Sequence, residues 1–254
     1  MAESKFLALD CGNTRIKATL LSGGAPERLV FNYDDIESLA KLAGSEDVGD
    51  VAMSAVGRVD VRLVETLRQA AGDRFLLLTP RMEMPIGIQY DNPAALGLDR
   101  KVACVAGAKL YPGERLLIID AGTALTKDVV GQDGDFLGGS ISPGLRMRFE
   151  SLHAGTHLLP DVSPDGEEEI RNLGRSTRGS LLAGAAGGLL DEVEAAIRRE
   201  GRCGATRVLF CGGDGEWVMN HLDGEELGGM KLEYHPDLIA IGLREIYRHH
   251  EENL

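Results

Sequence analysis

Residues 10–17 read Asp-Cys-Gly-Asn-Thr-Arg-Ile-Lys, and residues 120–127 read Asp-Ala-Gly-Thr-Ala-Leu-Thr-Lys. Each stretch follows an apolar run, at 6–9 in the first case and at 116–119 in the second. Each also continues into a second apolar segment, so the pattern predicts a strand, a tight turn and a strand at both places. Because the repeat recurs at nearly half the chain length, it indicates a duplicated fold.

The residue types of the two turns suit a phosphate group. Gly12 and Gly122 lack a Cβ, which allows a positive φ and lets backbone N–H groups approach a phosphate closely. Asn13, Thr14 and Thr123 add short donors and acceptors, and the leading aspartate can hold a cation. In a single copy these residues would more often form an ordinary hairpin, because aspartate, glycine and asparagine are favoured in turns. Their duplication favours phosphate binding.

Composition narrows the class of protein. The chain has 254 residues, with 27 basic and 40 acidic side chains and a net charge of −13. It has no run of lysine or arginine, so nucleic acid and anionic membranes are poor partners. No apolar stretch approaches the roughly 20 residues that span a bilayer, and the N-terminal residues do not resemble a signal peptide. We expect a cytoplasmic protein with reduced thiols at the scattered Cys11, Cys104, Cys203 and Cys211.

Hydrophobic periodicity predicts the same order of elements in both halves. In the first half we expect strands near 6–12, 15–22, 27–33, 51–56 and 74–78, and helices from 34, over 61–71 and over 99–110. In the second half we expect strands near 116–121, 125–130, 135–140 and 207–211, and helices over 145–154, 177–199 and 237–249. Three strands followed by a helix are typical of a ribonuclease-H-like half. We therefore predict an α/β protein of two such halves, 1–113 and 114–254, packed around a central cleft.

A third motif, Gly97-Leu98-Asp99-Arg100, lies between the two turns. Its carboxylate could take a proton from a hydroxyl group while the guanidinium holds an anionic substrate group through two hydrogen bonds. On its own, such a motif is more often a capping aspartate beside a solvated arginine.

Taken together, the three motifs resemble those of the type III pantothenate kinases. These enzymes belong to the superfamily of acetate kinase, sugar kinases, Hsp70 and actin. The family patterns Asp-x-Gly-Asn-Thr-x-x-Lys, Gly-x-Asp-Arg and Asp-x-Gly-Thr-Ala-x-Thr-x-Asp match residues 10–17, 97–100 and 120–128 in that order. Further similarity covers 138–145, 158–160, 174–177 and 211–215, so the resemblance extends from about residue 6 to about residue 245.

The resemblance implies an enzyme that phosphorylates pantothenate to 4'-phosphopantothenate with ATP, the first step of coenzyme A biosynthesis. It assigns to the ATP site Asp10, Cys11, Gly12, Asn13, Thr14, Arg15, Ile16, Lys17 and Thr123. It assigns to the pantothenate site Tyr90, Gly97, Leu98, Asp99, Arg100 and Thr177, with Asp99 as the base on the primary hydroxyl. It also implies Mg²⁺ bound with the nucleotide, a potassium or ammonium ion at Asp120, and a homodimer that uses the long helices of the second half.

Two other classes of function stay open on the sequence. One is a catalytically weak or inactive relative that acts as a nucleotide-binding regulatory or accessory protein. The other is a kinase for another small acidic metabolite, or a phosphate hydrolase, on the same fold. The pairing of Asp99 with Arg100 favours catalysis, because a binding module does not need both. Without the resemblance, Tyr90 would be a half-buried aromatic residue and Thr177 a helix N-cap, and the alignment of Lys127 with Lys17 could be accidental.

Overall fold

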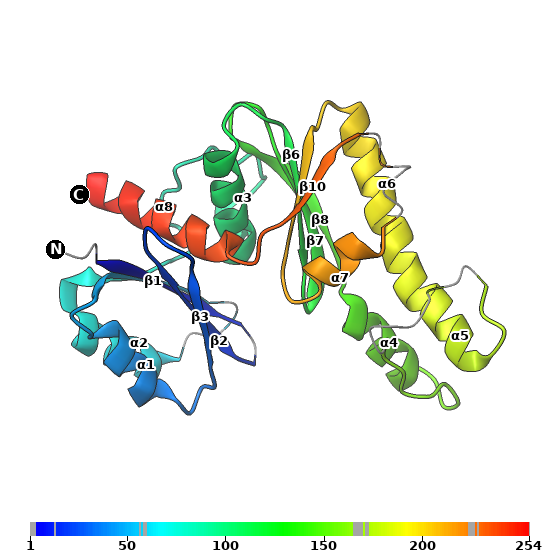
Figure 1. Cartoon of the computed structure of the whole chain (residues 1–254), viewed down its shortest axis with the longest axis horizontal. Helices are drawn as coiled ribbons and strands as arrows, with labels where there is room; N and C mark the ends of the chain where they lie inside the picture. The colour runs from blue at the N-terminus through cyan, green and yellow to red at the C-terminus, as the bar shows by residue number, and fades with distance from the viewer. Residues whose placement is uncertain are drawn as a thin grey trace. The chain divides into compact units, whose positions relative to one another are not determined.

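Two five-stranded sheets with the same internal order form the framework of the protein (Figure 1). The computed structural model describes residues 4–12, 14–55, 57, 60–164, 170, 173–222, 227 and 229–253. Its contacts group the chain into two units. Unit 1 comprises Met1–Pro112, Gly134–Phe136 and Asp237–Leu254, and unit 2 comprises Gly113–Asp133 and Leu137–Pro236.

Unit 1 is built on sheet A, with strand order β3-β2-β1-β4-β5. The first three strands are antiparallel, and β4 and β5 join them in parallel. The elements are β1 (Lys5–Cys11), β2 (Ile16–Leu21), β3 (Glu27–Phe31), α1 (Ile36–Ala43), β4 (Val48–Ala55), α2 (Val61–Ala71), the 3₁₀ turn η1 (Gly72–Arg74), β5 (Phe75–Leu77), the 3₁₀ turn η2 (Pro93–Ala95), α3 (Leu98–Leu110) and α8 (Leu238–Glu252).

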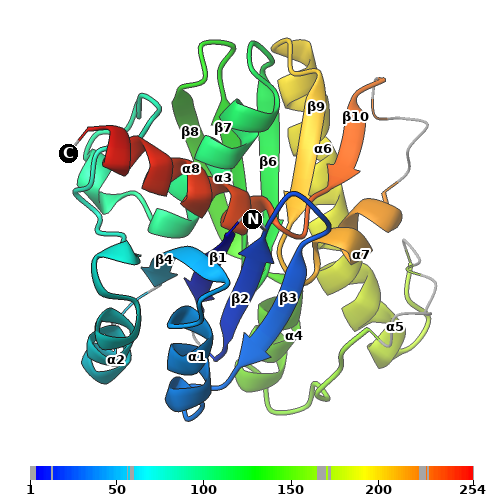
Figure 2. The same cartoon turned by 60° about the vertical axis from the view of Figure 1, so that its left-hand side comes forward.

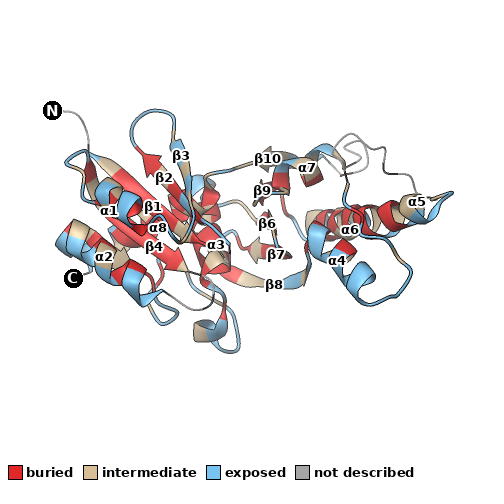
Figure 3. Cartoon of the chain, turned by 90° about the horizontal axis from the view of Figure 1, so that it is seen from below, coloured by how far each residue is buried: buried red, intermediate tan, exposed pale blue. Residues whose placement is uncertain are grey.

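Alternation along β1 divides its side chains between two cores. Leu7 and Leu9 pack with the buried faces of α1 and α2, whereas Phe6 and Ala8 pack with α3 and α8. The helices therefore cover both faces of sheet A, as Figures 1 and 2 show. In Figure 3 the strands are mostly buried, and the outer faces of α1 and α2 are exposed. The apolar residues of α1 recur at helical spacing, which is why one face of this helix is buried.

Unit 2 is built on sheet B, with strand order β10-β9-β6-β7-β8. Read from β8, this order repeats that of sheet A, so the duplicated fold predicted from the two turns is confirmed. The elements are β6 (Leu116–Ala121), β7 (Ala124–Val130), β8 (Phe136–Pro143), α4 (Leu145–Ala154), α5 (Thr177–Leu181), the π-helical segment η3 (Leu182–Gly187), α6 (Gly188–Arg202), β9 (Arg207–Cys211), α7 (Gly215–Asn220) and β10 (Lys231–Tyr234).

The two faces of sheet B differ in character. Leu117, Ile119 and Phe210 point into an apolar core shared with α4, η3 and α6. The register places Arg207 beside Leu116, on the opposite face.

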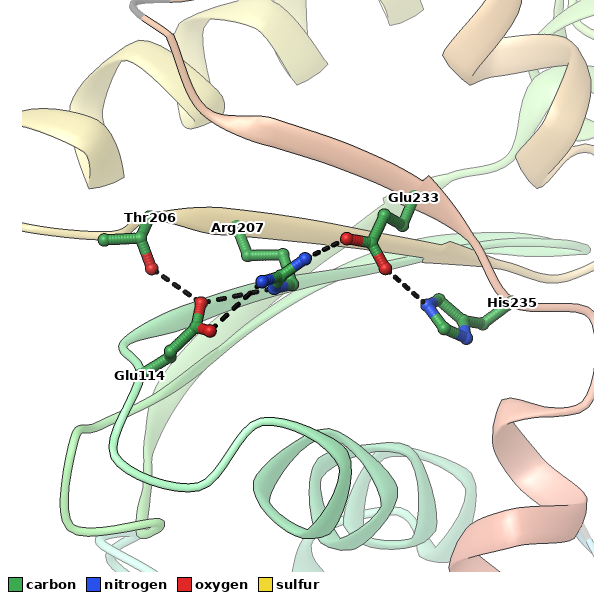
Figure 4. A network of polar contacts seen from close by, with 5 residues as sticks. All are labelled: Glu114, Thr206, Arg207, Glu233 and His235. Atoms are coloured by element: carbon green, nitrogen blue, oxygen red, sulfur yellow. Dashed lines mark hydrogen bonds and ion pairs between the residues drawn. The ribbon is translucent and has the colours of Figure 1, made fainter.

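On that face Arg207 lies between two carboxylates (Figure 4). Glu114 accepts hydrogen bonds from Arg207 and, at 2.9 Å, from Thr206, which hold the pKa of Glu114 below its usual value. Glu233 pairs with Arg207 from the other side and lies 3.2 Å from Nε2 of His235. This network joins β10 to β9 at the edge of the sheet.

The observed units differ in two places from the simple division at residue 113. The C-terminal helix α8 lies in unit 1, because Leu243 and Ile246 pack in the same core as Phe6 and Leu98. The tip of the β7–β8 hairpin, Gly134–Phe136, also lies in unit 1. Both differences depend on long-range packing, which sequence periodicity does not show.

Three elements differ from the prediction. The helix expected over 177–199 is divided into α5, the π-helical segment η3 and α6, along a stretch rich in glycine. Strand β10 and helix α7 were not predicted, since both are short. Across the described residues, no helix combines the length and apolar character needed to cross a bilayer.

Candidate active site

Three polar side chains lie side by side on neighbouring strands of sheet A, next to the first turn. Asp10 near the end of β1 is paired with Lys17 on β2 and with Ser54 on β4. Residues abreast in a sheet point to the same face. Asp10 therefore shares its face with Phe6 and Ala8, which is the face covered by α3 and α8.

The charges on this face act on one another. Burial raises the pKa of Asp10 above its usual value, Lys17 opposes this increase, and Asp99 adds to it. Asp99 lies in the first turn of α3, so the structure brings the predicted base close enough to Asp10 for the two charges to interact. Ser54 adds a hydroxyl that is 3 % exposed and has no hydrogen-bond partner within the part of the chain that the structure describes.

The turn after Asp10 is closed by two hydrogen bonds. The N–H of Gly12 donates to the carbonyl of Arg15 at 3.1 Å, and the Tyr33 hydroxyl donates to the carbonyl of Gly12 at 2.6 Å. The prediction that Gly12 and Gly122 adopt a positive φ is wrong, because neither residue has one. Thr14, Arg15 and Lys17 are exposed, Ile16 is buried, and Asn13 lies outside the described residues.

Cys11 is buried in the turn and does not supply a nucleophile. Burial and the neighbouring Asp10 raise the pKa of its thiol to about 12. The thiol therefore stays protonated near neutral pH. Its side chain packs in the core with Leu9 and Ile16.

The Gly-x-Asp-Arg motif begins α3. Gly97 is the N-cap, and Oδ1 of Asp99 accepts a hydrogen bond from the N–H of Arg100 at 2.9 Å. Leu98 is buried in the core with Val102. Arg100 is only 5 % exposed, so the alternative of a solvated arginine is wrong.

An aromatic pair lies beside Arg100. Its guanidinium carbon is 5.6 Å from the centre of the Phe136 ring, and the ring of Tyr90 meets Phe136 edge to face at 6.0 Å. Tyr90 is 41 % exposed, so part of its surface is open to a ligand.

Lys101 is a buried charge that the sequence did not reveal. It is 2 % exposed, its Nζ donates to the carbonyl of Pro80 at 2.8 Å, and burial lowers its pKa. Lysine is rarely buried to this extent. The only signal in the sequence was its position next to the motif.

The second turn is one residue shorter than the first. Asp120 is paired with Thr126, and Lys127 is paired with Ile119, on the other face of sheet B. Lys127 forms an ion pair with Glu192 of α6. Lys127 therefore does not repeat the position of Lys17.

A glycine loop after β9 packs against the second turn. Gly212 has a φ of +85°, and a Cβ there would lie 2.3 Å from Oδ1 of Asp120. The N–H of Asp214 donates to the carbonyl of Ala121 at 2.9 Å. Only glycine fits at 212, both for its backbone conformation and for this close approach.

Two further predicted site residues lie in unit 2. Thr123 is exposed, and its carbonyl accepts a hydrogen bond from the N–H of Gly144 at 3.1 Å. Thr177 is the exposed first residue of α5. The N-cap is Ser176, whose hydroxyl accepts from the N–H of Gly179 at 3.0 Å, so the alternative of Thr177 as a cap is wrong.

Comparison with known proteins identifies the family. The family model for type III pantothenate kinase matches residues 6–199. The chain belongs to the type III pantothenate kinase family. A type III pantothenate kinase of Porphyromonas gingivalis is 33% identical over 246 residues, which cover 94% of this chain and 96% of the relative. One of Persephonella marina is 32% identical over 261 residues, covering 96% and 99%.

Solved structures show the same fold at lower identity. A conserved Baf family protein of Campylobacter jejuni matches this type III pantothenate kinase family member with a TM-score of 0.62 and 22% identity, over 98% of this chain and 100% of the other. Acetate kinase of Porphyromonas gingivalis matches with a TM-score of 0.52 and 14% identity, over 96% and 100%. The predicted α/β fold of two ribonuclease-H-like halves is thereby confirmed.

Proposed function

We propose that this protein transfers the γ-phosphoryl group of ATP to the primary hydroxyl of pantothenate. The product is 4'-phosphopantothenate, and the reaction opens coenzyme A biosynthesis. Membership of the family supports this function. The observation that carries it in the structure is the interaction of Asp10, Lys17 and Asp99 on one face of sheet A.

The ATP phosphates would bind at the two turns. In unit 1 the exposed Lys17 suits a polyphosphate, and residues 10–16 of the first turn would line the phosphates. Thr123 in unit 2 is exposed and would also contact the nucleotide. Mg²⁺, when bound with ATP, neutralises charge on the phosphates. Asp10 fits a role as its carboxylate partner, because Mg²⁺ in such sites takes one or two carboxylates together with phosphate oxygens and water. The residues assigned to the nucleotide are Asp10, Cys11, Gly12, Asn13, Thr14, Arg15, Ile16, Lys17 and Thr123.

Asp99 would accept the hydroxyl proton of pantothenate and orient the oxygen for attack. A carboxylate is a weak base near neutral pH, with an ordinary pKa of about 3.9. It is sufficient here, because phosphoryl transfer through a loose transition state needs mainly positioning and neutralisation of charge. The Asp99 carboxylate already accepts the N–H of Arg100, which restrains its orientation.

Arg100 would bind the carboxylate of pantothenate through two parallel hydrogen bonds. Tyr90, Gly97, Leu98 and Thr177 complete the proposed pantothenate contacts. Leu98 would contribute its backbone, since its side chain lies in the core. The half-exposed ring of Tyr90 offers an apolar surface to the substrate.

The cation, the dimer and the compartment are further parts of the proposal. Asp120 would hold a potassium or ammonium ion. A homodimer would use the second half of the chain, where Leu158 and Leu173 are 93% and 82% exposed. The free state of the described cysteines suits a reducing compartment, so we place the reaction in the cytoplasm.

A coupled assay of ADP release tests the proposal directly. ATP hydrolysis alone should be slow, and addition of pantothenate should raise ADP release and yield one phosphorylated product by mass spectrometry. Omission of potassium and ammonium should reduce this rate. A protein that binds ATP but releases no ADP with pantothenate would contradict the proposal and support a regulatory role.

A further inference from the structure

Phe136 occupies an unusual position in the chain. It begins β8 of sheet B, yet it is fully buried among residues of unit 1. Its N–H donates to the carbonyl of Gly87 at 2.9 Å, and its carbonyl accepts from the N–H of Gln89 at 2.9 Å. These bonds form an isolated parallel bridge between Phe136 and Ile88.

The residue before it strengthens this attachment. Oδ1 of Asp135 accepts a hydrogen bond from the N–H of Gly87 at 2.8 Å. A Cβ at residue 87 would lie 2.5 Å from both carboxylate oxygens of Asp135, so a larger residue there would displace this side chain. These bonds attach the backbone of residues 135–136 to the segment 87–89, which fixes the direction in which the Phe136 side chain leaves the backbone.

The ring is in contact with two residues of the proposed pantothenate site. The guanidinium of Arg100 lies over it at 5.6 Å, and the edge of Tyr90 meets it at 6.0 Å with 65° between the planes. A cation over an aromatic face is attracted by the ring quadrupole, and an edge-to-face pair is the preferred aromatic geometry. One buried ring therefore restrains both side chains.

Restraint of this kind matters for an arginine that binds a carboxylate. The side chain has many rotamers, and ordering it on binding costs affinity. A guanidinium already held in one plane presents its fork of donors with less of that cost. The same ring keeps Tyr90 beside Arg100, although ten residues separate them in sequence.

We infer that Phe136 is a positioning residue that determines selectivity for the carboxylate end of the acceptor, by orienting Arg100 and Tyr90. This inference rests on the proposed function. It adds a residue from the tip of the β7–β8 hairpin to the determinants of substrate choice. Phe136 itself touches neither the reacting oxygen nor the phosphate in this account.

The test compares Phe136→Leu with Phe75→Leu in steady-state kinetics. Phe75 is also a buried phenylalanine of unit 1, but it packs in the core beneath α1 and α2. We expect Phe136→Leu to raise the KM for pantothenate about five- to thirtyfold. The KM for ATP should change by less than about twofold, and kcat should fall less than the KM rises. Phe75→Leu should lower thermal stability without this selective change.

A second substrate distinguishes a loss of selectivity from a general loss of activity. Pantetheine carries an amide where pantothenate carries the carboxylate, so it cannot use the fork of Arg100. The ratio of kcat/KM for pantothenate to that for pantetheine should fall in Phe136→Leu and stay at the parent value in Phe75→Leu. If Phe136→Leu does not fold by circular dichroism, Phe136→Met takes its place, with the same expected fall, because its flexible unbranched side chain adapts to the site but carries no ring.

The outcomes distinguish the inference from the function on which it rests. An unchanged ratio, or an equal rise in the KM for ATP, in a Phe136 variant of an active enzyme would overturn the inference and leave the kinase assignment intact. A parent protein without activity on pantothenate would overturn the proposed function and the inference with it. A selective loss on pantothenate alone would support both.

Discussion

Replacement of Glu192 by glutamine tests the electrostatics of unit 2. Glu192 on α6 accepts hydrogen bonds from Lys127 of β7, from Ser142 of β8 at 2.7 Å and from Arg148 of α4. Burial acts to raise its pKa, but these three donors outweigh it and lower the pKa to about 2. The side chain is 29% exposed, and that of Lys127 is 8% exposed. The Glu192 carboxylate thus links α6 to β7, β8 and α4.

The lowered pKa of Glu192 gives the size of the expected loss of stability. Lowering it from 4.5 to about 2 stabilises the folded, ionised form, which corresponds to about 3 kcal/mol at about 1.36 kcal/mol for each pH unit. This shift places the expected destabilisation of Glu192→Gln near 3 kcal/mol at about pH 7.

The dependence on pH has a definite sign. A carboxylate with a lowered pKa contributes its stability above its unfolded pKa and loses it as the pH falls through the folded pKa. The difference between parent and Glu192→Gln should therefore be full above pH 4.5 and decline toward pH 2, the window set by the two values. At about pH 3.5 we expect about 2 kcal/mol to remain.

Urea unfolding monitored by tryptophan fluorescence is the appropriate assay. Trp217 is the single tryptophan and lies on α7 of unit 2, so it reports on the unit that contains Glu192. Glu150→Gln is the matched control, since its ion pair with Arg146 is exposed and should contribute less than about 1 kcal/mol. A difference for Glu192→Gln below about 1 kcal/mol, or one that does not change with pH, would refute the reasoning.

Three further predictions concern the site. Arg100→Lys should raise the KM for pantothenate about ten- to a hundredfold and leave that for ATP nearly unchanged, because an ammonium cannot replace the planar fork; a selective effect on ATP would place Arg100 at the phosphates. Asp120→Ala should abolish activation by potassium or ammonium together with activity, and an unchanged activation curve would place the cation elsewhere. Ser54→Ala should raise the free energy of unfolding of the ligand-free protein by about 1 kcal/mol, because it removes a buried hydroxyl that has no partner in the described structure; a loss of stability in urea would contradict this.

Local patterns predicted much of the fold. Helix α2 begins and ends where periodicity placed it, and Asp60 caps it by accepting from the N–H groups of Arg62 and Leu63. The strand, turn and strand around Asp10 and around Asp120 are confirmed. In these segments, the local sequence preferences agree with the final structure.

Features that depend on distant contacts could not be predicted in this way. Strand β10 has only four residues and forms beside β9 at the edge of sheet B. Nothing near Phe136 in the sequence indicates that its ring lies against Tyr90 and Arg100. The expectation of a positive φ for Gly122 failed for a related reason, since the positive φ and the close approach at the Asp120 turn belong to Gly212, 92 residues along the chain from Asp120.

The most direct test of the central claim is the steady-state kinetics of Asp99→Asn with ATP and pantothenate. This variant keeps the size of the side chain and removes its ability to take a proton. We predict that kcat falls about 10²- to 10⁴-fold, while the KM values for both substrates stay within a few-fold of the parent. A kcat within a few-fold of the parent would contradict the role of Asp99 and the proposed site with it.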